Sequence, residues 1–394
     1  MKKTARLAVI TLAAALTLTG CGDRGDTPSS SDTPTETTSA SPSPTQSNPD
    51  FKACMVSDSG GFDDKSFNQT SHDGLETAKT DLGIKTAQIE SQSNSEYADN
   101  INALVQQDCN VITTVGFLLG EATEKAAKKN PDVDFSIVDF AYFDEKGNNV
   151  APDNLRGLTF DTAGPSFLAG YLAAGMSKSG VVGTFGGLPI PTVTIFMDGY
   201  WEGVQYYNQE NGKDVKVVGW DEKTQKGSFT EDFEDKTKGQ AIAENMIQQG
   251  ADVIFPVAGP AGLGGLQAAQ DSNGQVKGIW VDTDGCVSAA EYCGVLLSSV
   301  MKGMDIAVGQ SIKDSLEGNF TGEPYVGTLE NEGVALAPYH ELDSEIPQEL
   351  KDQIEDIKQK LIDGEIEITS PPRRSKAQQL VESGRGPRSL PDSA

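Results

Sequence analysis

The sequence predicts an α/β protein made of two similar lobes, and two observations carry this prediction. Short apolar runs typical of buried strands alternate with helical stretches along the body of the chain, as in parallel sheets with crossover helices. A unit of helix, strand, loop, helix and strand that begins at Ile101 is also repeated from Ile242. Because the chain has 394 residues, each copy can belong to a domain with its own hydrophobic core.

The amino-terminal part has the features of an export signal followed by a tether. Basic residues precede an apolar run over residues 7–18, which ends in the lipobox-like sequence LTGC at Cys21. We expect residues 1–20 to be a signal peptide whose apolar run is too short for a durable membrane span, and Cys21 to be lipidated. Residues 21–50 are mostly Ser, Thr, Pro, Gly and Asp, which predicts a disordered tether at the extracytoplasmic face of the cell membrane.

The loop sequence SDSGGFDDKSFNQ follows a strand predicted at 51–56 and leads into a helix that begins near Ser66. Loops between the carboxyl end of a strand and a helix bind small molecules in open α/β folds. Asp58 and Asn68 offer hydrogen-bonding groups, and Phe67 offers a flat apolar face. We interpret the loop as a ligand-binding element; a solvated acidic turn with Phe67 in the core is the alternative.

The internal repeat matches Gly116 with Gly259 and Asp139 with Asp282, and each aspartate follows a predicted strand. The predicted strands of the two copies and of the segment between them are apolar runs at 111–115, 135–138, 181–185, 215–218, 253–257 and 278–281.

A phenylalanine opens each half of the chain in an equivalent place. Phe67 stands seven residues before Gly74, and Phe196 stands seven residues before Gly203. Two similar lobes have a natural ligand site between them, and symmetry would bring the two rings in from opposite sides. Facing aromatic rings suit a flat ligand.

The rest of the body continues the pattern. Residues 298–316 have helical spacing and are expected to cross back to the first lobe, and 318–336 carry short strand and turn signals. A last helix is predicted at 347–363, with a proline at its start and a glycine after its end. Residues 371–394 change in composition to Arg, Ser, Gly and Gln, which indicates a disordered tail.

Charge and cysteine content exclude some functions. The formal net charge of −27 makes nucleic acid a poor partner, and the absence of a phosphate-binding GxxxxGK[ST] loop disfavours nucleotides. In an exported chain, the four cysteines besides Cys21 suggest disulfides, and of three possible pairings we favour Cys54 with Cys109 and Cys286 with Cys293. We expect no metal, since the two histidines lie far from these cysteines in the sequence.

Catalytic motifs are missing: there is no GxSxG and no HExxH, and neither histidine has an obvious partner in the sequence. The acidic sequence from Asp282 to Gly285 is weakly similar to the calcium-binding motif of nucleoside hydrolases, but that motif is longer and opens the chain. We therefore favour a binding protein without a cofactor, in which Asp282 and Asp284 accept hydrogen bonds from sugar hydroxyls.

Several motifs in order resemble the basic membrane protein (Bmp) family of substrate-binding lipoproteins: SDSGGFDDKSFNQ, the region around PIPTVTIFMDGYWEG, AGPAGLG, WVDTDG and SSVMKGMDIAV. The resemblance covers about residues 51–370. It implies a type I periplasmic binding protein, with two Rossmann-like lobes joined by three hinge crossovers. The implied N-terminal lobe is 51–165 plus about 290–318, and the C-terminal lobe is 166–289 plus about 319–370.

The resemblance also implies a function, which is delivery of a purine nucleoside to the permease of an ABC transporter. It implies that Phe67 and Phe196 stack on the base and that Asn68 and Asp139 lie near its edge. The residues implied at the ribose, or as places of close backbone approach, are Asp58, Asp282 or Asp284, Lys302, Gly116 and Gly259, and Phe117 adjoins them.

This chain departs from the family pattern at two places. Gly285 and Cys286 stand where an amide is usual, and Pro260 replaces a residue expected to be small and flexible. The departure at Gly285 and Cys286 concerns the implied contacts with the sugar. Beside the resemblance, other functions stay open: a sensory lipoprotein without a transporter, a binder of a riboflavin-like ligand or a sugar, and, more remotely, a nucleoside hydrolase-like enzyme.

Overall fold

A computed structural model describes residues 47–369 of the chain. The predicted signal peptide, the lipidation site Cys21, nearly all of the tether and the tail lie outside these residues. The described part contains two six-stranded sheets, so the predicted α/β class with two lobes is confirmed. No helix of the described part is both long and apolar enough to cross a membrane.

The first sheet has the strand order β13-β5-β4-β3-β1-β2, and all of its pairs are parallel. Its central strands are buried along nearly their whole length, as parallel strands covered on both faces must be. Edge strand β2 consists only of exposed and half-buried residues instead. The strands are β1 (Lys52–Ser57), β2 (Lys85–Glu90), β3 (Val111–Val115), β4 (Asp134–Val138), β5 (Leu155–Phe160) and β13 (Tyr325–Gly327).

The second sheet has the order β14-β12-β11-β10-β6-β7, in which only the β12–β14 pair is antiparallel. A separate small hairpin pairs β8 (Trp220–Asp221) with β9 (Lys226–Gly227). The strands of the second sheet are β6 (Val181–Gly186), β7 (Lys216–Val218), β10 (Val253–Val257), β11 (Lys277–Asp282), β12 (Leu296–Lys302) and β14 (Val334–Leu336).

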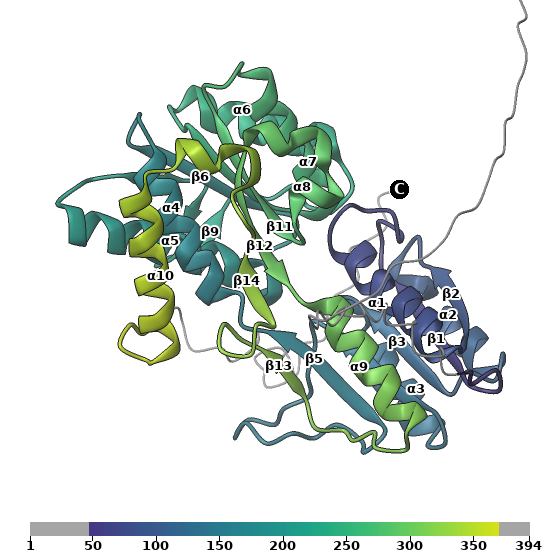
Figure 1. Ribbon diagram of the computed structural model, residues 1–394. Helices are drawn as coiled ribbons and strands as arrows, with labels where there is room; N and C mark the ends of the chain where they lie inside the picture. The colour runs from purple at the N-terminus through teal and green to yellow at the C-terminus, as the bar shows by residue number, and fades with distance from the viewer. Residues whose placement is uncertain (1–46, 370–394) are drawn as a thin grey trace, which may run out of the picture. The chain divides into compact units, whose positions relative to one another are not determined.

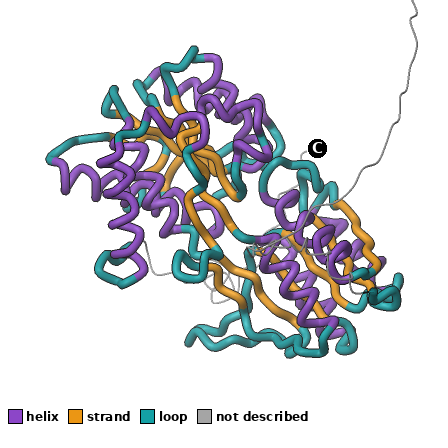
Figure 2. Tube along the Cα trace, in the orientation of Figure 1, coloured by secondary structure: helices purple, strands orange, loops and turns teal. Residues whose placement is uncertain are grey.

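The helices divide between the two sheets, as Figure 1 shows by label and Figure 2 by element type. Helix α9 packs against α1 and the first sheet, whereas α4 packs against α5, α10 and the second sheet. Helix α4 is apolar on all sides and buried over nearly all of its length. The helices are α1 (Phe67–Leu82), α2 (Tyr97–Val105), α3 (Gly120–Lys129), α4 (Ala163–Met176), α5 (Pro191–Asn211), α6 (Lys236–Gln248), α7 (Gly259–Asp271), α8 (Gly285–Ser288), α9 (Met304–Leu316) and α10 (Gln348–Ile362).

The internal repeat corresponds to real structural units. Helix, strand, loop, helix and strand run from α2 to β4 in the first lobe and from α6 to β11 in the second. Gly74 and Gly203, which follow Phe67 and Phe196 by seven residues, also have the same structural role. Each lies at a close contact between two helices. A Cβ on Gly74 would be 2.5 Å from the carbonyl oxygen of Asp305, and one on Gly203 would be 2.0 Å from that of Phe167.

The chain passes between the sheets three times: from β5 to α4, from β12 to α9 and from β13 to β14. The helix predicted at 298–316 is wrong in its first third, because β12 occupies residues up to Lys302 and α9 begins at Met304. Apolar spacing fitted a helix through this stretch, but Gly303 separates the strand from the helix. Residues 296–302 therefore lie in the second sheet and 325–327 in the first, unlike the division implied by the resemblance.

Two disulfides join the favoured cysteine pairs. Cys54 in β1 is bonded to Cys109, just before β3, and both are buried. Cys286 in α8 is bonded to Cys293, which closes a short loop between β11 and β12.

Candidate functional site

A cavity lies between the carboxyl ends of the strands of the two sheets, with about 610 Å³ of empty space that includes open solvent. Its wall combines the loop after β1 and the start of α1 with the ends of β4, β11 and β12 and the start of α5. All the predicted binding residues except Asp284 line it: Asp58, Phe67, Asn68, Gly116, Phe117, Asp139, Phe196, Gly259, Asp282 and Lys302.

Lys302 forms ion pairs inside this cavity with one aspartate from each lobe. Its Nζ lies 2.6 Å from Asp139 Oδ2, at the end of the first lobe's β4, and 3.5 Å from Asp282 Oδ1, at the end of the second lobe's β11. Burial alone would lower the pKa of Lys302, but the two carboxylates outweigh it and raise the pKa, so the ammonium stays charged. Lys302 stands at the end of a strand and is buried, not on a solvated helix face.

Asp139 and Asp282 share an uncommon backbone conformation as well as their cation. Their φ angles are 64° and 71°, in the left-handed region that residues other than glycine rarely adopt. The same turn thus follows equivalent strands in the two lobes and directs both carboxylates at one ammonium. This confirms the equivalence that the sequence repeat predicted for the two residues.

Phe67 and Phe196 enter the cavity from different lobes, at the first residue of α1 and within the first two turns of α5. The Nζ of Lys302 lies 5.0 Å from the centroid of each ring. Both rings therefore face one point in the cavity, where a cation interacts favourably with their π systems.

Asp58 and Asn68 form a hydrogen-bonded pair on the first lobe's side of the cavity. Asn68 Nδ2 donates to Asp58 Oδ1 at 3.0 Å, whereas Asn68 Oδ1 is buried and accepts no hydrogen bond from the described residues. Burial raises the pKa of Asp58 to about 8, so its carboxyl is mostly protonated at neutral pH. Gly116 is required beside it, since a Cβ there would lie 2.1 Å from Asp58 Oδ2.

Asp64 is a cavity residue that sequence reasoning missed, although it stands in the loop that was singled out. Its carboxylate accepts hydrogen bonds from the backbone amides of Ser66, Asn68 and Gln69, so it closes the amino-terminal end of α1. Burial raises its pKa to about 6. The spacing of an aspartate two residues before a serine at a helix start was the signal that could have revealed it.

Hydrogen bonds at Lys65 and Ser66 join the loop after β1 to the second lobe beside the cavity. Ser66 Oγ donates to Asp282 Oδ2 at 2.8 Å, and Trp280 Nε1 donates to the carbonyl oxygen of Lys65 at 3.2 Å. Lys65 has a φ of 62°, a strained conformation that turns its carbonyl toward Trp280. The second lobe therefore also helps to fix this loop of the first lobe.

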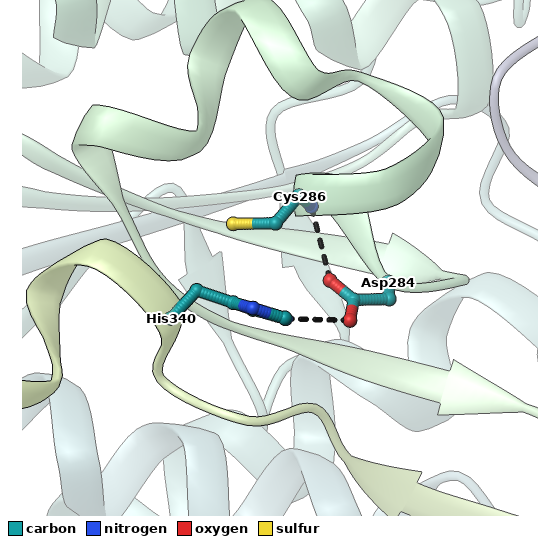
Figure 3. A group of neighbouring side chains, drawn as sticks. All are labelled: Asp284, Cys286 and His340. Atoms are coloured by element: carbon teal, nitrogen blue, oxygen red, sulfur yellow. Dashed lines mark hydrogen bonds and ion pairs between the residues drawn. The ribbon is translucent and has the colours of Figure 1, made fainter. Parts of the chain in front are cut away.

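Asp284, which was also predicted to bind the ligand, does not line the cavity. Its Oδ1 accepts a hydrogen bond from the Cys286 backbone amide at the start of α8, and its Oδ2 lies 2.6 Å from His340 Nε2 (Figure 3). The expectation of no metal rested on the distance between histidines and cysteines in the sequence, and this reason does not hold for His340, which adjoins Cys286 in space. Donor atoms of Asp284, Cys286 and His340 all lie within 4.8 Å of one another.

Most of the apolar lining of the cavity could not be identified from the sequence, because such residues look the same as core residues there. Pro260 lines the cavity at the start of α7, so the departure noted at this position does bear on the site. The other lining residues that sequence reasoning missed are Ser59, Leu118, Ile190, Thr192, Val193, Phe233, Val257 and Val281.

Comparison with known proteins gives a consistent result. The family model Bmp, described as ABC transporter substrate-binding protein PnrA-like, matches residues 51–371. A CD4+ T-cell-stimulating antigen of Listeria innocua is 30% identical over 94% of this chain and 99% of its own length. The ABC transporter nucleoside-binding protein BmpA of Lactococcus lactis subsp. cremoris is 31% identical over 82% of this chain and 90% of its own.

Among solved structures, a solute-binding protein of an ABC transporter system from Aeropyrum pernix is similar, with a TM-score of 0.71 and 26% identity. The similarity covers 84% of this chain and 97% of that one. Two Rossmann-like lobes with a cavity between them are thus the arrangement of a solute-binding protein.

Proposed function

Because the chain belongs to the Bmp family of PnrA-like ABC transporter substrate-binding proteins, we propose that the ligand it captures is a purine nucleoside. Proteins of this family work outside the cytoplasm, bind a small molecule for the permease of a transporter and are not enzymes. We further propose that Cys21 carries a lipid that anchors the chain to the outer face of the cell membrane, since LTGC ends the apolar run.

The observation that carries the ligand proposal is the pair of aromatic rings that face one point in the cavity. A flat heterocycle between Phe67 and Phe196 would stack on both rings, and stacking of a base on one aromatic side chain is worth about 1 to 3 kcal/mol. The name of the Lactococcus lactis relative, a nucleoside-binding protein, supports the same ligand class.

The polar groups of the cavity supply the hydrogen bonds that a purine nucleoside needs. The buried, unpaired Oδ1 of Asn68 suits an N–H of the base, and the protonated carboxyl of Asp58 can donate to an acceptor next to it. The carboxylates of Asp139 and Asp282, with Lys302 between them, suit ribose hydroxyls or the rest of the base edge.

The charge of the cavity favours a nucleoside over a nucleotide. One buried ammonium, Lys302, is already shared by two carboxylates, and no further Lys or Arg lines the cavity in the described residues. A phosphate placed there would meet Asp139 and Asp282 without a free cation to neutralise it, which is unfavourable in a buried site.

The test is thermal unfolding of the chain against guanosine, adenosine, inosine, free bases, nucleotides, riboflavin and sugars. A ligand at a hundred times its dissociation constant stabilises the folded chain by about 2.7 kcal/mol. We expect purine nucleosides to raise the unfolding midpoint, and Phe67→Ala or Phe196→Ala to weaken binding by at least about tenfold. Phe143→Ala, at an exposed ring outside the cavity, is the matched control. A shift with only a sugar or riboflavin would refute the proposal.

A further inference from the structure

Three side chains of different chemistry converge beside the second sheet, outside the ligand cavity. Asp284 and Cys286 stand in the turn after β11, and His340 stands after β14 at the start of a short 3₁₀ helix, His340–Glu345. One donor atom from each lies within 4.8 Å of the others, and Figure 3 shows the Asp284 carboxylate facing the His340 ring with the Cys286 side chain beside them. Among the described residues this is the only such group with three potential metal ligands.

The carboxylate is held in place between the other two residues. Asp284 Oδ1 accepts from the backbone amide of Cys286 at 3.0 Å, and Oδ2 lies 2.6 Å from His340 Nε2. His340 itself has a φ of 43°, a conformation that residues other than glycine rarely adopt. About a third of the His340 side chain and a fifth of the Asp284 side chain are exposed, 33% and 18%, so a dissolved ion can reach both.

The donor set suits one class of metal ion. Sulfur, imidazole nitrogen and carboxylate oxygen together bind Zn²⁺ and similar transition-metal ions, whereas Ca²⁺ and Mg²⁺ prefer oxygen alone. Bonds of about 2.0 to 2.3 Å at tetrahedral angles place donor atoms about 3.3 to 3.8 Å apart. The three residues therefore need to shift by about an ångström or less, and the ion takes the place of the proton between Asp284 and His340.

The sulfur of Cys286 is not free, because it is bonded to Cys293. We propose that reduction of the Cys286–Cys293 disulfide creates a binding site for a Zn²⁺-type ion, formed by Asp284, Cys286 and His340. A dithiol reductant supplies two electrons and two protons: the S–S bond breaks, both cysteines become thiols, and the reductant becomes a disulfide. The ion then binds the Cys286 thiolate, and the thiol proton passes to solvent.

The location of the two disulfides makes the step selective. Cys54 and Cys109 are buried, with 1% and 3% of their surface exposed. Cys286 is half-buried in a four-residue helix on a loop and Cys293 is 7% exposed, so this disulfide lies closer to the surface than Cys54–Cys109. In the oxidised chain the Cys286 sulfur is part of the disulfide and cannot bind the ion. The site is therefore either disulfide-bonded or metal-bound.

The proposal can be tested in a variant in which Cys286 has a free thiol without any reductant. Cys293→Ser removes its partner and leaves Cys54–Cys109 intact, and Cys21→Ser in the same full-length chain prevents a contribution from that thiol. This variant is titrated with Co²⁺, a coloured substitute for Zn²⁺. We expect one Co²⁺ per chain, a thiolate-to-cobalt charge-transfer absorption, and loss of that absorption when Zn²⁺ is added.

Further variants decide which residues bind the ion. Adding His340→Gln should weaken Co²⁺ binding at least tenfold, whereas adding His72→Gln, at the chain's other histidine, should leave it unchanged. The Cys21→Ser chain with its second disulfide intact should show no thiolate absorption. The proposal is overturned if the Cys293→Ser chain, folded by circular dichroism, shows no thiolate absorption, if His340→Gln has no effect, or if the oxidised chain binds Co²⁺ equally well.

Discussion

Asp58 lines a cavity that contains several other carboxyl groups. Its protonation reduces the repulsion between these groups, because a neutral carboxyl adds no negative charge. Lys302 neutralises Asp139 and Asp282 but does not contact Asp58 in the described structure. Burial therefore keeps the proton on Asp58, with a pKa of about 8, and to a lesser degree on Asp64, with a pKa of about 6. The cavity thus contains fewer negative charges at neutral pH than its composition suggests.

This protonation predicts a pH dependence of stability. The folded chain binds the Asp58 proton more tightly than the unfolded chain, whose carboxyl has its ordinary pKa of 3.8. The stability from this group is therefore complete below that value and is lost as the pH rises through about 8. We expect the free energy of unfolding to fall more from about pH 5 to about pH 8 in the wild type than in Asp58→Asn, by about 4 kcal/mol, because three pH units each contribute about 1.4 kcal/mol.

Urea unfolding of both chains across this range, without ligand, measures the difference. Parallel curves for the wild type and Asp58→Asn would show that Asp58 is ionised in the folded chain.

Helices α4 and α5 of the second lobe pack so closely that their contact leaves no room for a Cβ at Gly203. In the contact between α4 and α5, a Cβ on Gly203 would lie 2.0 Å from the Phe167 carbonyl oxygen. A backbone carbonyl cannot move aside as a flexible side chain can. The glycine is therefore a requirement of the helix contact, although glycine lowers helix propensity.

Gly203→Ala should therefore lower the free energy of unfolding by about 1 to 3 kcal/mol, because α4 and α5 must separate. Gly309→Ala in α9 is the matched control, since the nearest heavy atom to its Cβ would be 3.9 Å away. There we expect no loss and a gain of up to about 1 kcal/mol from helix propensity. Denaturant unfolding compares the two variants with the wild type, and equal effects would contradict the packing argument.

How far the sequence could predict the site depended on the element that carries each residue. Asp139 and Asp282 were predictable because they end buried strands of a repeated unit, and parallel strand ends meet at one edge. Asp284 has the same residue type two positions later, but the chain has by then entered the turn of α8, which directs its side chain to His340. The approach of His340 depends on β14 pairing with β12, which no local pattern reveals.

The surroundings of Lys302 could not be predicted, because the secondary structure of its segment was predicted wrongly. Its neighbours have apolar spacing that fits a helix, and a lysine on a helix is usually solvated. Only pairing with β11 and β14 makes the segment a strand and buries the lysine between the lobes. The family resemblance identified the residue, whereas its surroundings required the three-dimensional structure.

At the scale of the whole molecule, polar contacts join the two lobes beside the cavity. Ser66 Oγ to Asp282 Oδ2 and Trp280 Nε1 to the Lys65 carbonyl cross from one lobe to the other. Such bonds form only when the lobes are together, so their free energy adds to ligand affinity and less to the folding of either lobe. Three chain crossings allow the hinge motion that opens and closes substrate-binding proteins.

Ser66→Ala should therefore weaken guanosine binding by about fivefold, the effect of about 1 kcal/mol for one hydrogen bond. Ser71→Ala is the control, because this buried hydroxyl donates to Phe67 O within the same helix and contacts no residue of the second lobe in the described structure. Isothermal titration calorimetry of the two variants makes the comparison. The prediction fails if both serines have the same effect on affinity.

The order in which the chain visits the two lobes also matters for how the protein is made. The first lobe needs α9 and β13, and the second needs β14 and α10. A chain that emerges from its amino terminus can therefore complete neither lobe until almost the last helix has been synthesised. Release of an early fragment, by a premature stop codon or by proteolysis during export, would leave two unfinished sheet edges instead of one working half.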